Sequence, residues 1–164
     1  MEEKKTYNVL FVCLGNICRS PSAEAVFRSA VERAGFEDRI GIDSAGISGY
    51  HAGEGADARM ARHAAHRGYR LTSVSRPVTE RDFDRFDLIV GMDDSNIRDL
   101  ERKAPREGCR TKIRRMTDFC TQHDETEVPD PYYGGAAGFE RVLDLLEDAC
   151  EGLLDYVRRE ADLS

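Results

Sequence analysis

Residues 9–21 read Val-Leu-Phe-Val-Cys-Leu-Gly-Asn-Ile-Cys-Arg-Ser-Pro, and this stretch decides the fold. Its first half is almost continuously apolar, which is typical of a strand buried on both faces of a parallel sheet. The Ser20-Pro21 pair favours a helix start, because serine can cap a helix and proline fits the first helical position. We therefore expect a strand at Asn8–Cys13, a short loop, and a helix that ends at Gly35.

Strands and helices are expected to alternate along the rest of the chain. This alternation predicts a three-layer α/β fold, in which a four-stranded parallel sheet carries helices on both faces. No internal repeat or linker divides the sequence, so residues 1–164 are expected to form a single domain. The further strands are expected at Gly41–Ala45, Asp87–Met92 and Lys112–Met116, and the further helices at Asp57–Arg67, from about Asp94, and at Phe139–Arg159, with a long polar loop at Thr117–Gly138 before the last helix.

Composition excludes several classes of protein. The net charge of −7 argues against a general nucleic-acid binder, which needs a basic surface to displace counterions. Five cysteines, an odd number without regular spacing, do not make a disulfide framework and favour a reducing compartment. The apolar run Val9–Leu14 is too short for a signal or a membrane span, so we expect a cytoplasmic protein without membrane contact.

Cys13 and Arg19 are separated by five residues at the junction of the first strand, its loop and the next helix. A loop this short curls so that successive backbone N–H groups point at one tetrahedral anion, and Gly15 and Asn16 tolerate the left-handed conformations that curling requires. The helix N-terminus and the planar guanidinium of Arg19 also favour phosphate. The predicted phosphate-binding residues are Leu14, Gly15, Asn16, Ile17, Cys18 and Arg19.

Cys13 is the predicted nucleophile, because a thiol in this positive site ionises readily and lies beneath the bound phosphate. Ser20 is expected to donate its hydroxyl to the thiolate. Cys109 and Arg115 show the same spacing, but their segment has no glycine and enters a strand instead of leaving one. We interpret that second pair as accidental.

The 9–21 stretch resembles the signature loop of the low-molecular-weight protein tyrosine phosphatases, and the resemblance covers essentially the whole chain. It implies an enzyme without metal or cofactor that hydrolyses phosphotyrosine through a phosphocysteine intermediate. The implied partner is a phosphotyrosine-containing protein; a cognate tyrosine kinase is a candidate by analogy, and a monomer is expected. The other matching segments are Asp43-Ser44-Ala45, Ser48-Gly49-Tyr50, Met92-Asp93-Asp94-Ser95-Asn96 and Asp130-Pro131-Tyr132-Tyr133-Gly134.

Asp130 matches the residue that carries the general acid in this family. Prolines on both sides restrict the backbone around its carboxyl group, although Asp-Pro alone would be read as an ordinary turn. The resemblance implies that Asp130 protonates the departing phenolate and later activates water, a role that typically contributes about 10²–10⁴-fold.

The resemblance also assigns the walls of the pocket. Tyr50, Tyr132 and Tyr133 are expected to line a slot for a flat phenyl ring, and the tyrosine pair is itself a candidate for phosphorylation. Related phosphatases that act on phosphoarginine carry threonine at the position of Ile17, so isoleucine favours a phenyl ring. A deep slot would admit a tyrosyl phosphate and exclude the shorter seryl and threonyl phosphates.

Three further residues are assigned by resemblance. Cys18 is expected to form a reversible disulfide with Cys13 that protects the nucleophile from irreversible oxidation. Ser44 is expected to hydrogen-bond Asn16 and so to hold the shape of the loop. Many relatives carry a histidine where this chain has Ser73, and serine can hydrogen-bond there but cannot carry charge.

No metal site is predicted, because His63 and His66 are interpreted as surface residues and His51 and His123 as isolated ones. The alternative functions are an arsenate reductase of the same fold, a phosphoarginine phosphatase, a phosphocysteine carrier, and a non-catalytic phosphotyrosine-binding module. The arsenate reductase needs relay cysteines, which the scattered Cys109, Cys120 and Cys150 do not suggest. A phosphocysteine carrier has no use for a general acid that expels phenolate. A binding module would be expected to lack Cys13 or Asp130, and both are present.

Overall fold

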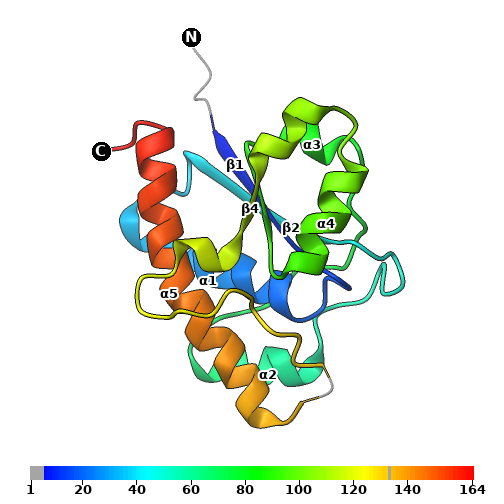
Figure 1. Cartoon of the computed structure of the whole chain (residues 1–164). Helices are drawn as coiled ribbons and strands as arrows, with labels where there is room; N and C mark the ends of the chain where they lie inside the picture. The colour runs from blue at the N-terminus through cyan, green and yellow to red at the C-terminus, as the bar shows by residue number, and fades with distance from the viewer. Residues whose placement is uncertain (1–5, 133) are drawn as a thin grey trace.

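The computed structural model describes residues 6–132 and 134–164 (Figure 1). Its centre is a four-stranded parallel sheet in the order β2-β1-β3-β4. The register between β1 and the edge strand β2 runs from Tyr7 opposite Ile40 to Cys13 opposite Gly46. The predicted fold class is confirmed. The strands are β1 (Tyr7–Cys13), β2 (Ile40–Gly46), β3 (Leu88–Gly91) and β4 (Ile113–Arg115).

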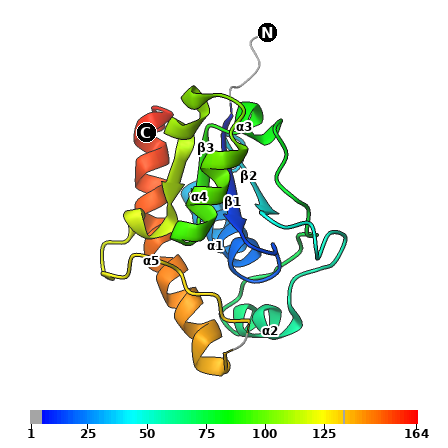
Figure 2. The ribbon, with the colours of Figure 1, turned by 45° about the vertical axis from the view of Figure 1, so that its right-hand side comes forward.

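Helices cover both faces of the sheet, and Figures 1 and 2 show α1 and α5 on one side with α3 and α4 on the other. Two short 3-10 helices, η1 and η2, flank β4. None of the helices in the described ranges is long and apolar enough to span a membrane. The helices are α1 (Arg19–Ala34), α2 (Ala58–His66), α3 (Asp82–Arg85), α4 (Asp94–Lys103), η1 (Glu107–Lys112), η2 (Met116–Phe119) and α5 (Ala136–Glu160).

The apolar run in β1 forms the centre of two cores. Successive side chains of a strand point to opposite faces. Val9 and Phe11 therefore pack into the larger core beneath α1 and α5, where the Phe11 ring meets Phe27 edge to face at 5.6 Å. Leu10 and Val12 pack into the smaller core beneath α3 and α4. Because β1 is buried on both faces, its position within the sheet is fixed. The position of Cys13, its last residue, is fixed with it.

Two predicted helix starts are wrong by a few residues. Helix α1 begins at Arg19, and its N-cap is Cys18, without a side-chain cap. Ser20 does not cap the helix because its hydroxyl is used in the phosphate-binding loop, and Pro21 is tolerated because the first-turn N–H groups need no helical partner. Helix α5 begins at Ala136 instead of Phe139.

Cys109 lies in η1 and is buried in the smaller core, alongside Leu10 and Phe83. Its segment enters β4 and forms no loop at a strand end. Cys109 and Arg115 therefore flank no anion-binding loop, which agrees with the interpretation that their spacing is accidental.

Candidate active site

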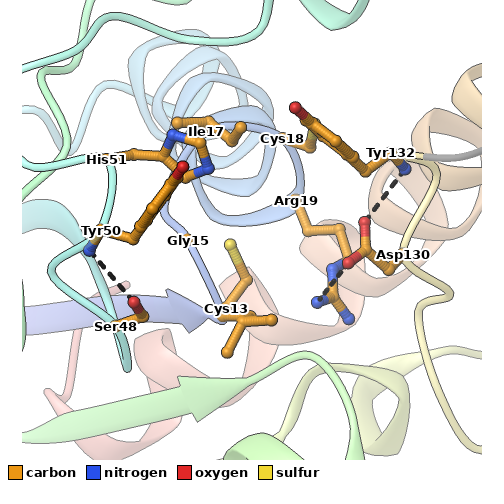
Figure 3. A pocket seen from close by; sticks show the side chains of 11 residues that line it. Cys13, Gly15, Ile17, Cys18, Arg19, Ser48, Tyr50, His51, Asp130 and Tyr132 are labelled. Atoms are coloured by element: carbon orange, nitrogen blue, oxygen red, sulfur yellow. Dashed lines mark hydrogen bonds and ion pairs between the residues drawn. The ribbon is translucent and has the colours of Figure 1, made fainter.

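The loop between β1 and α1 curls into a cup, and Figure 3 shows the sulfur of Cys13 pointing into it. Asn16 has φ 57°, the left-handed conformation that the curl requires. Two bonds from the 75–76 segment hold the curl: Ser75 Oγ donates to the Gly15 carbonyl oxygen at 2.9 Å, and the Arg76 N–H donates to Asn16 Oδ1 at 3.1 Å.

The amide of Asn16 joins the loop to the nucleophile and to β2. Its Nδ2 donates to Ser20 Oγ at 2.7 Å and to Ser44 Oγ at 3.0 Å. Because Ser20 Oγ accepts from Asn16, its own proton can be donated to Cys13 Sγ, which lies 3.1 Å away, or to the more distant Ala45 carbonyl oxygen at 3.4 Å. Ser44 and Ser20 thus occupy the positions that their predicted supporting roles require.

Glu24 completes this network and was missed by the sequence analysis. Its carboxylate is buried near the start of α1, where Oε1 accepts the Ser44 hydroxyl at 2.6 Å and Oε2 accepts from Arg28 at 2.8 Å. A glutamate one turn into an amphipathic helix looks like a solvated residue. Only the packing of α1 against β2 shows that the Glu24 side chain faces inward.

Arg19 is 2% exposed and is held at the mouth of the cup by two long-range bonds. Its Nη1 donates to Asp93 Oδ2 at 2.7 Å and to the Val128 carbonyl oxygen at 3.0 Å. Burial alone would lower the pKa of Arg19, but the Coulomb attraction of Cys13 and the bond to Asp93 raise it overall. The guanidinium therefore stays charged where an anion would bind.

Asp130 approaches the same site from the loop between η2 and α5. Its Oδ2 lies 3.8 Å from Arg19 Nη2, and its Oδ1 accepts the Tyr132 N–H at 3.0 Å. The side chain is 44% exposed, so it meets both the cavity and solvent. A carboxyl group in this position can exchange protons with a ligand and with water.

These groups converge on one cavity of about 490 Å³ (Figure 3). Of the four residues predicted to wall it, Ile17, Tyr50 and Tyr132 line it, and Tyr133 lies outside the described residues. The complete lining is Cys13, Leu14, Gly15, Ile17, Cys18, Arg19, Ser48, Tyr50, His51, Asp130 and Tyr132.

His51 is a lining residue that the sequence analysis misread as isolated. Its Nδ1 pairs with Glu54 at 2.9 Å, and its ring meets Tyr50 edge to face at 4.9 Å. A side chain added at Gly15 would meet the His51 ring at 3.0 Å, so glycine allows this close approach. His123 is not isolated either, because its Nδ1 lies 2.8 Å from Asp148.

The second loop cysteine lines the cavity beside Cys13. Burial raises the pKa of the Cys18 thiol to about 12, and the nearby Asp57 carboxylate adds to this shift, so Cys18 is protonated at neutral pH. All five cysteines are free thiols. A Cys13–Cys18 disulfide stays a prediction.

Ser73 has a buried Oγ with no hydrogen-bond partner within residues 6–132 and 134–164. The loop is instead held by Ser75 and by the Glu24–Ser44 pair. Over the same residues, no group of three His, Cys, Asp or Glu side chains is arranged to bind a metal. His63 pairs with Glu140, and His66 is exposed.

The chain is similar to known proteins of one family over most of its length. A family model described as low molecular weight phosphotyrosine protein phosphatase matches residues 8–163. A low molecular weight protein-tyrosine-phosphatase of Streptomyces coelicolor is 47% identical over 159 residues, covering 96% of this chain and 97% of that protein. The low molecular weight phosphotyrosine protein phosphatase of Sus scrofa is 42% identical over 159 residues, covering 96% of this chain and 100% of that protein.

A solved structure shows the same fold. The crystal structure of a protein tyrosine phosphatase from Entamoeba histolytica, with Hepes in the active site, has a TM-score of 0.92 at 48% identity. The match covers 94% of this chain and 99% of that chain. The chain therefore belongs to the low molecular weight phosphotyrosine protein phosphatase family.

Proposed function

We propose that this protein hydrolyses phosphotyrosine in proteins through a phosphocysteine intermediate on Cys13. The observation that carries the proposal is the convergence of three groups on one cavity: the sulfur of Cys13, the buried guanidinium of Arg19 and the carboxyl of Asp130. Each group has a place in phosphate transfer, as nucleophile, as clamp for the phosphoryl oxygens, and as proton donor.

The first half of the reaction transfers phosphate to sulfur. The Cys13 thiolate attacks phosphorus, the bond from phosphorus to the phenolic oxygen breaks, and Asp130 gives its proton to that oxygen. The loop N–H groups and Arg19 neutralise the negative charge on the phosphoryl oxygens. Ser20, with Oγ 3.1 Å from Cys13 Sγ, stabilises the sulfur anion before attack and after release.

The second half releases inorganic phosphate. Asp130, now a carboxylate, takes a proton from a water molecule, whose oxygen attacks phosphorus as the bond to sulfur breaks. The partial exposure of Asp130 gives water access to this position. The products are inorganic phosphate and the regenerated Cys13 thiolate.

The walls of the cavity support an aromatic substrate. Ile17, Tyr50 and Tyr132 surround the approach to the cup and can contact the two faces of a phenyl ring. A phosphoserine side chain is too short to carry its phosphate past these walls. Isoleucine at position 17, where phosphoarginine phosphatases carry threonine, supports phosphotyrosine over phosphoarginine.

One assay tests the proposal. The purified protein is offered phosphotyrosyl, phosphoseryl and phosphoarginyl peptides, and arsenate with thiol, in buffer without added metal. We expect hydrolysis of the phosphotyrosyl peptide, an inactive Cys13→Ser variant, and an Asp130→Ala variant slowed by about 10²-fold or more. Arsenate reduction at a comparable rate, or full turnover by Cys13→Ser, would overturn the proposal.

Compartment, kinase partner and oligomeric state remain predictions of the same proposal. Five free thiols are consistent with the reducing cytoplasm, where we place the protein. A cognate tyrosine kinase is the candidate substrate, because such a kinase carries the phosphotyrosine that this chemistry removes. A monomer is expected.

A further inference from the structure

Helix α2 lies beside the active site and is bonded to the phosphate-binding loop. The N–H of Asp57, the N-cap residue of α2, donates to the Ile17 carbonyl oxygen at 2.8 Å. The Asp57 carboxylate accepts the N–H groups of Arg59 at 2.9 Å and Met60 at 3.2 Å. Asp57 is thereby fixed relative to the loop that holds the phosphate.

Arg59 extends this connection to residues 128–132, here called the acid segment because they include the proposed general acid, Asp130. Its Nη2 lies 3.1 Å from Asp57 Oδ2 and also donates to the Tyr132 carbonyl oxygen at 2.9 Å. Its guanidinium lies over the Tyr132 ring at 5.3 Å and over the Phe139 ring of α5 at 5.1 Å. The guanidinium of Arg59 therefore hydrogen-bonds to the acid segment and also packs against one aromatic ring of that segment and one of α5.

The acid segment needs such support because it has little structure of its own. No helix or strand is found among the described residues between Phe119, the end of η2, and Ala136, the start of α5. Val128, two residues before Asp130, is anchored by its N–H to the Met92 carbonyl oxygen at 2.8 Å and by its own carbonyl to Arg19. Two residues after Asp130, the bond from Arg59 to Tyr132 provides the matching anchor.

From this geometry we propose that Arg59 is a positioning residue for the general acid. It holds the acid segment where the Asp130 carboxyl can reach the leaving-group oxygen. This inference rests on the proposed function and deepens it. Arg59 is not among the residues that line the cavity, and it acts through Tyr132. A misplacement of about 1 Å at a catalytic group can cost about 10²-fold in rate.

The test is the dependence of kcat/KM on the acidity of the leaving group. Arg59→Gln is compared with the unchanged protein on phenyl phosphate, nitrophenyl phosphate and dinitrophenyl phosphate, because a good leaving group departs without a proton and a poor one does not. We expect a loss of about 10-fold on phenyl phosphate and less than about twofold on dinitrophenyl phosphate. An equal loss on all three substrates would overturn the proposal.

Arg114→Gln is a matched control. Arg114 also stacks over two aromatic rings, Phe119 at 5.1 Å and Tyr156 at 5.4 Å, but it lies away from the cavity. We expect this variant to keep the leaving-group dependence of the unchanged protein. Arg59→Lys keeps the charge beside Asp57 but loses the planar fork of the guanidinium. We expect it to change the leaving-group dependence of kcat/KM in the same direction as Arg59→Gln, but by less. This variant tests the proposal if Arg59→Gln folds poorly.

A double variant separates this inference from the proposed function. In an Asp130→Ala background, Arg59→Gln should add no further leaving-group dependence, because the acid that it positions is gone. If Asp130→Ala steepens the dependence and Arg59→Gln alone does not, the positioning role fails while the proposed function stands. If Asp130→Ala leaves the dependence unchanged, the assignment of the general acid fails, and the role of Arg59 fails with it.

Discussion

At the scale of single residues, Asn16 combines strain with hydrogen bonding. Its φ of 57° is a conformation that costs most residues free energy, and its side chain bonds to Ser20, Ser44 and the Arg76 N–H. Two substitutions distinguish these contributions, because Asn16→Gly removes the bonds without strain whereas Asn16→Ala removes the bonds and adds strain.

We expect Asn16→Ala to be less stable than Asn16→Gly by about 1 kcal/mol in urea unfolding. Both variants should lose phosphate affinity, since both lose the bonds that hold the loop. Equal stability of the two variants would show that the left-handed conformation is not retained in them.

Single residues of the site were predictable where the partners are close in sequence. Cys13 and Arg19 lie on one loop, so their spacing, with Gly15 and Asn16 between them, predicts a phosphate cup. Glu24, Asp93 and His51 join the site through contacts between segments that are distant in the chain. Arg19 reaches Asp93 across 74 residues, and the His51 ring lies close to Gly15. Their pattern in the sequence does not differ from that of solvated surface residues.

At the scale of elements, the close packing of α5 on η2 depends on Gly152. A Cβ at this position would collide with the backbone carbonyl oxygen of Phe119, which cannot move as a side chain can. Alanine is the better helix former by about 1 kcal/mol, so propensity alone predicts that Gly152→Ala stabilises the protein. We expect the collision to dominate and the variant to be destabilised by about 1–3 kcal/mol.

Gly138 in the same helix is the matched control. A Cβ there would lie 3.6 Å from Pro131 Cβ, an ordinary contact. We expect Gly138→Ala to be neutral or to stabilise by up to about 1 kcal/mol, with both variants measured by denaturant unfolding. Stabilisation by both substitutions would mean that helix propensity, and not contact with Phe119, decides the stability of α5.

At the scale of the whole molecule, the alternation of strands and helices was predictable because burial controls it. The apolar run in β1 packs into both cores, and a continuous apolar run is the pattern that predicts burial on both faces of a strand. The starts of α1 and α5 were less predictable. Ser20 looks like a cap by local chemistry, but tertiary contacts with Cys13 and Asn16 occupy its hydroxyl. The capping preference of serine fails to predict the start of α1 because the site uses the Ser20 hydroxyl.

The stability of the whole molecule should depend on pH through Asp148, a buried carboxylate that joins α5 to the loop after η2. Its oxygens accept the N–H groups of Thr121 and Gln122 and pair with His123. Burial alone would raise the pKa of Asp148, but these hydrogen bonds outweigh it and lower the pKa from 3.8 to about 2. A lowered pKa in the folded state stabilises the protein above the unfolded value, and this contribution is lost as pH falls through the folded value.

We therefore expect Asp148→Asn to cost about 2 kcal/mol of unfolding free energy near neutral pH, because the carboxylate is replaced by a neutral amide that cannot accept all of these bonds. The difference from the unchanged protein should shrink below about pH 4 and largely disappear near pH 2, where Asp148 itself becomes protonated. Asp155→Asn, at an exposed position on the same helix, is the control. A difference for Asp148→Asn that stays constant from neutral to acid pH would show that side-chain packing, and not the ionised carboxylate, anchors the loop that leads to Asp130.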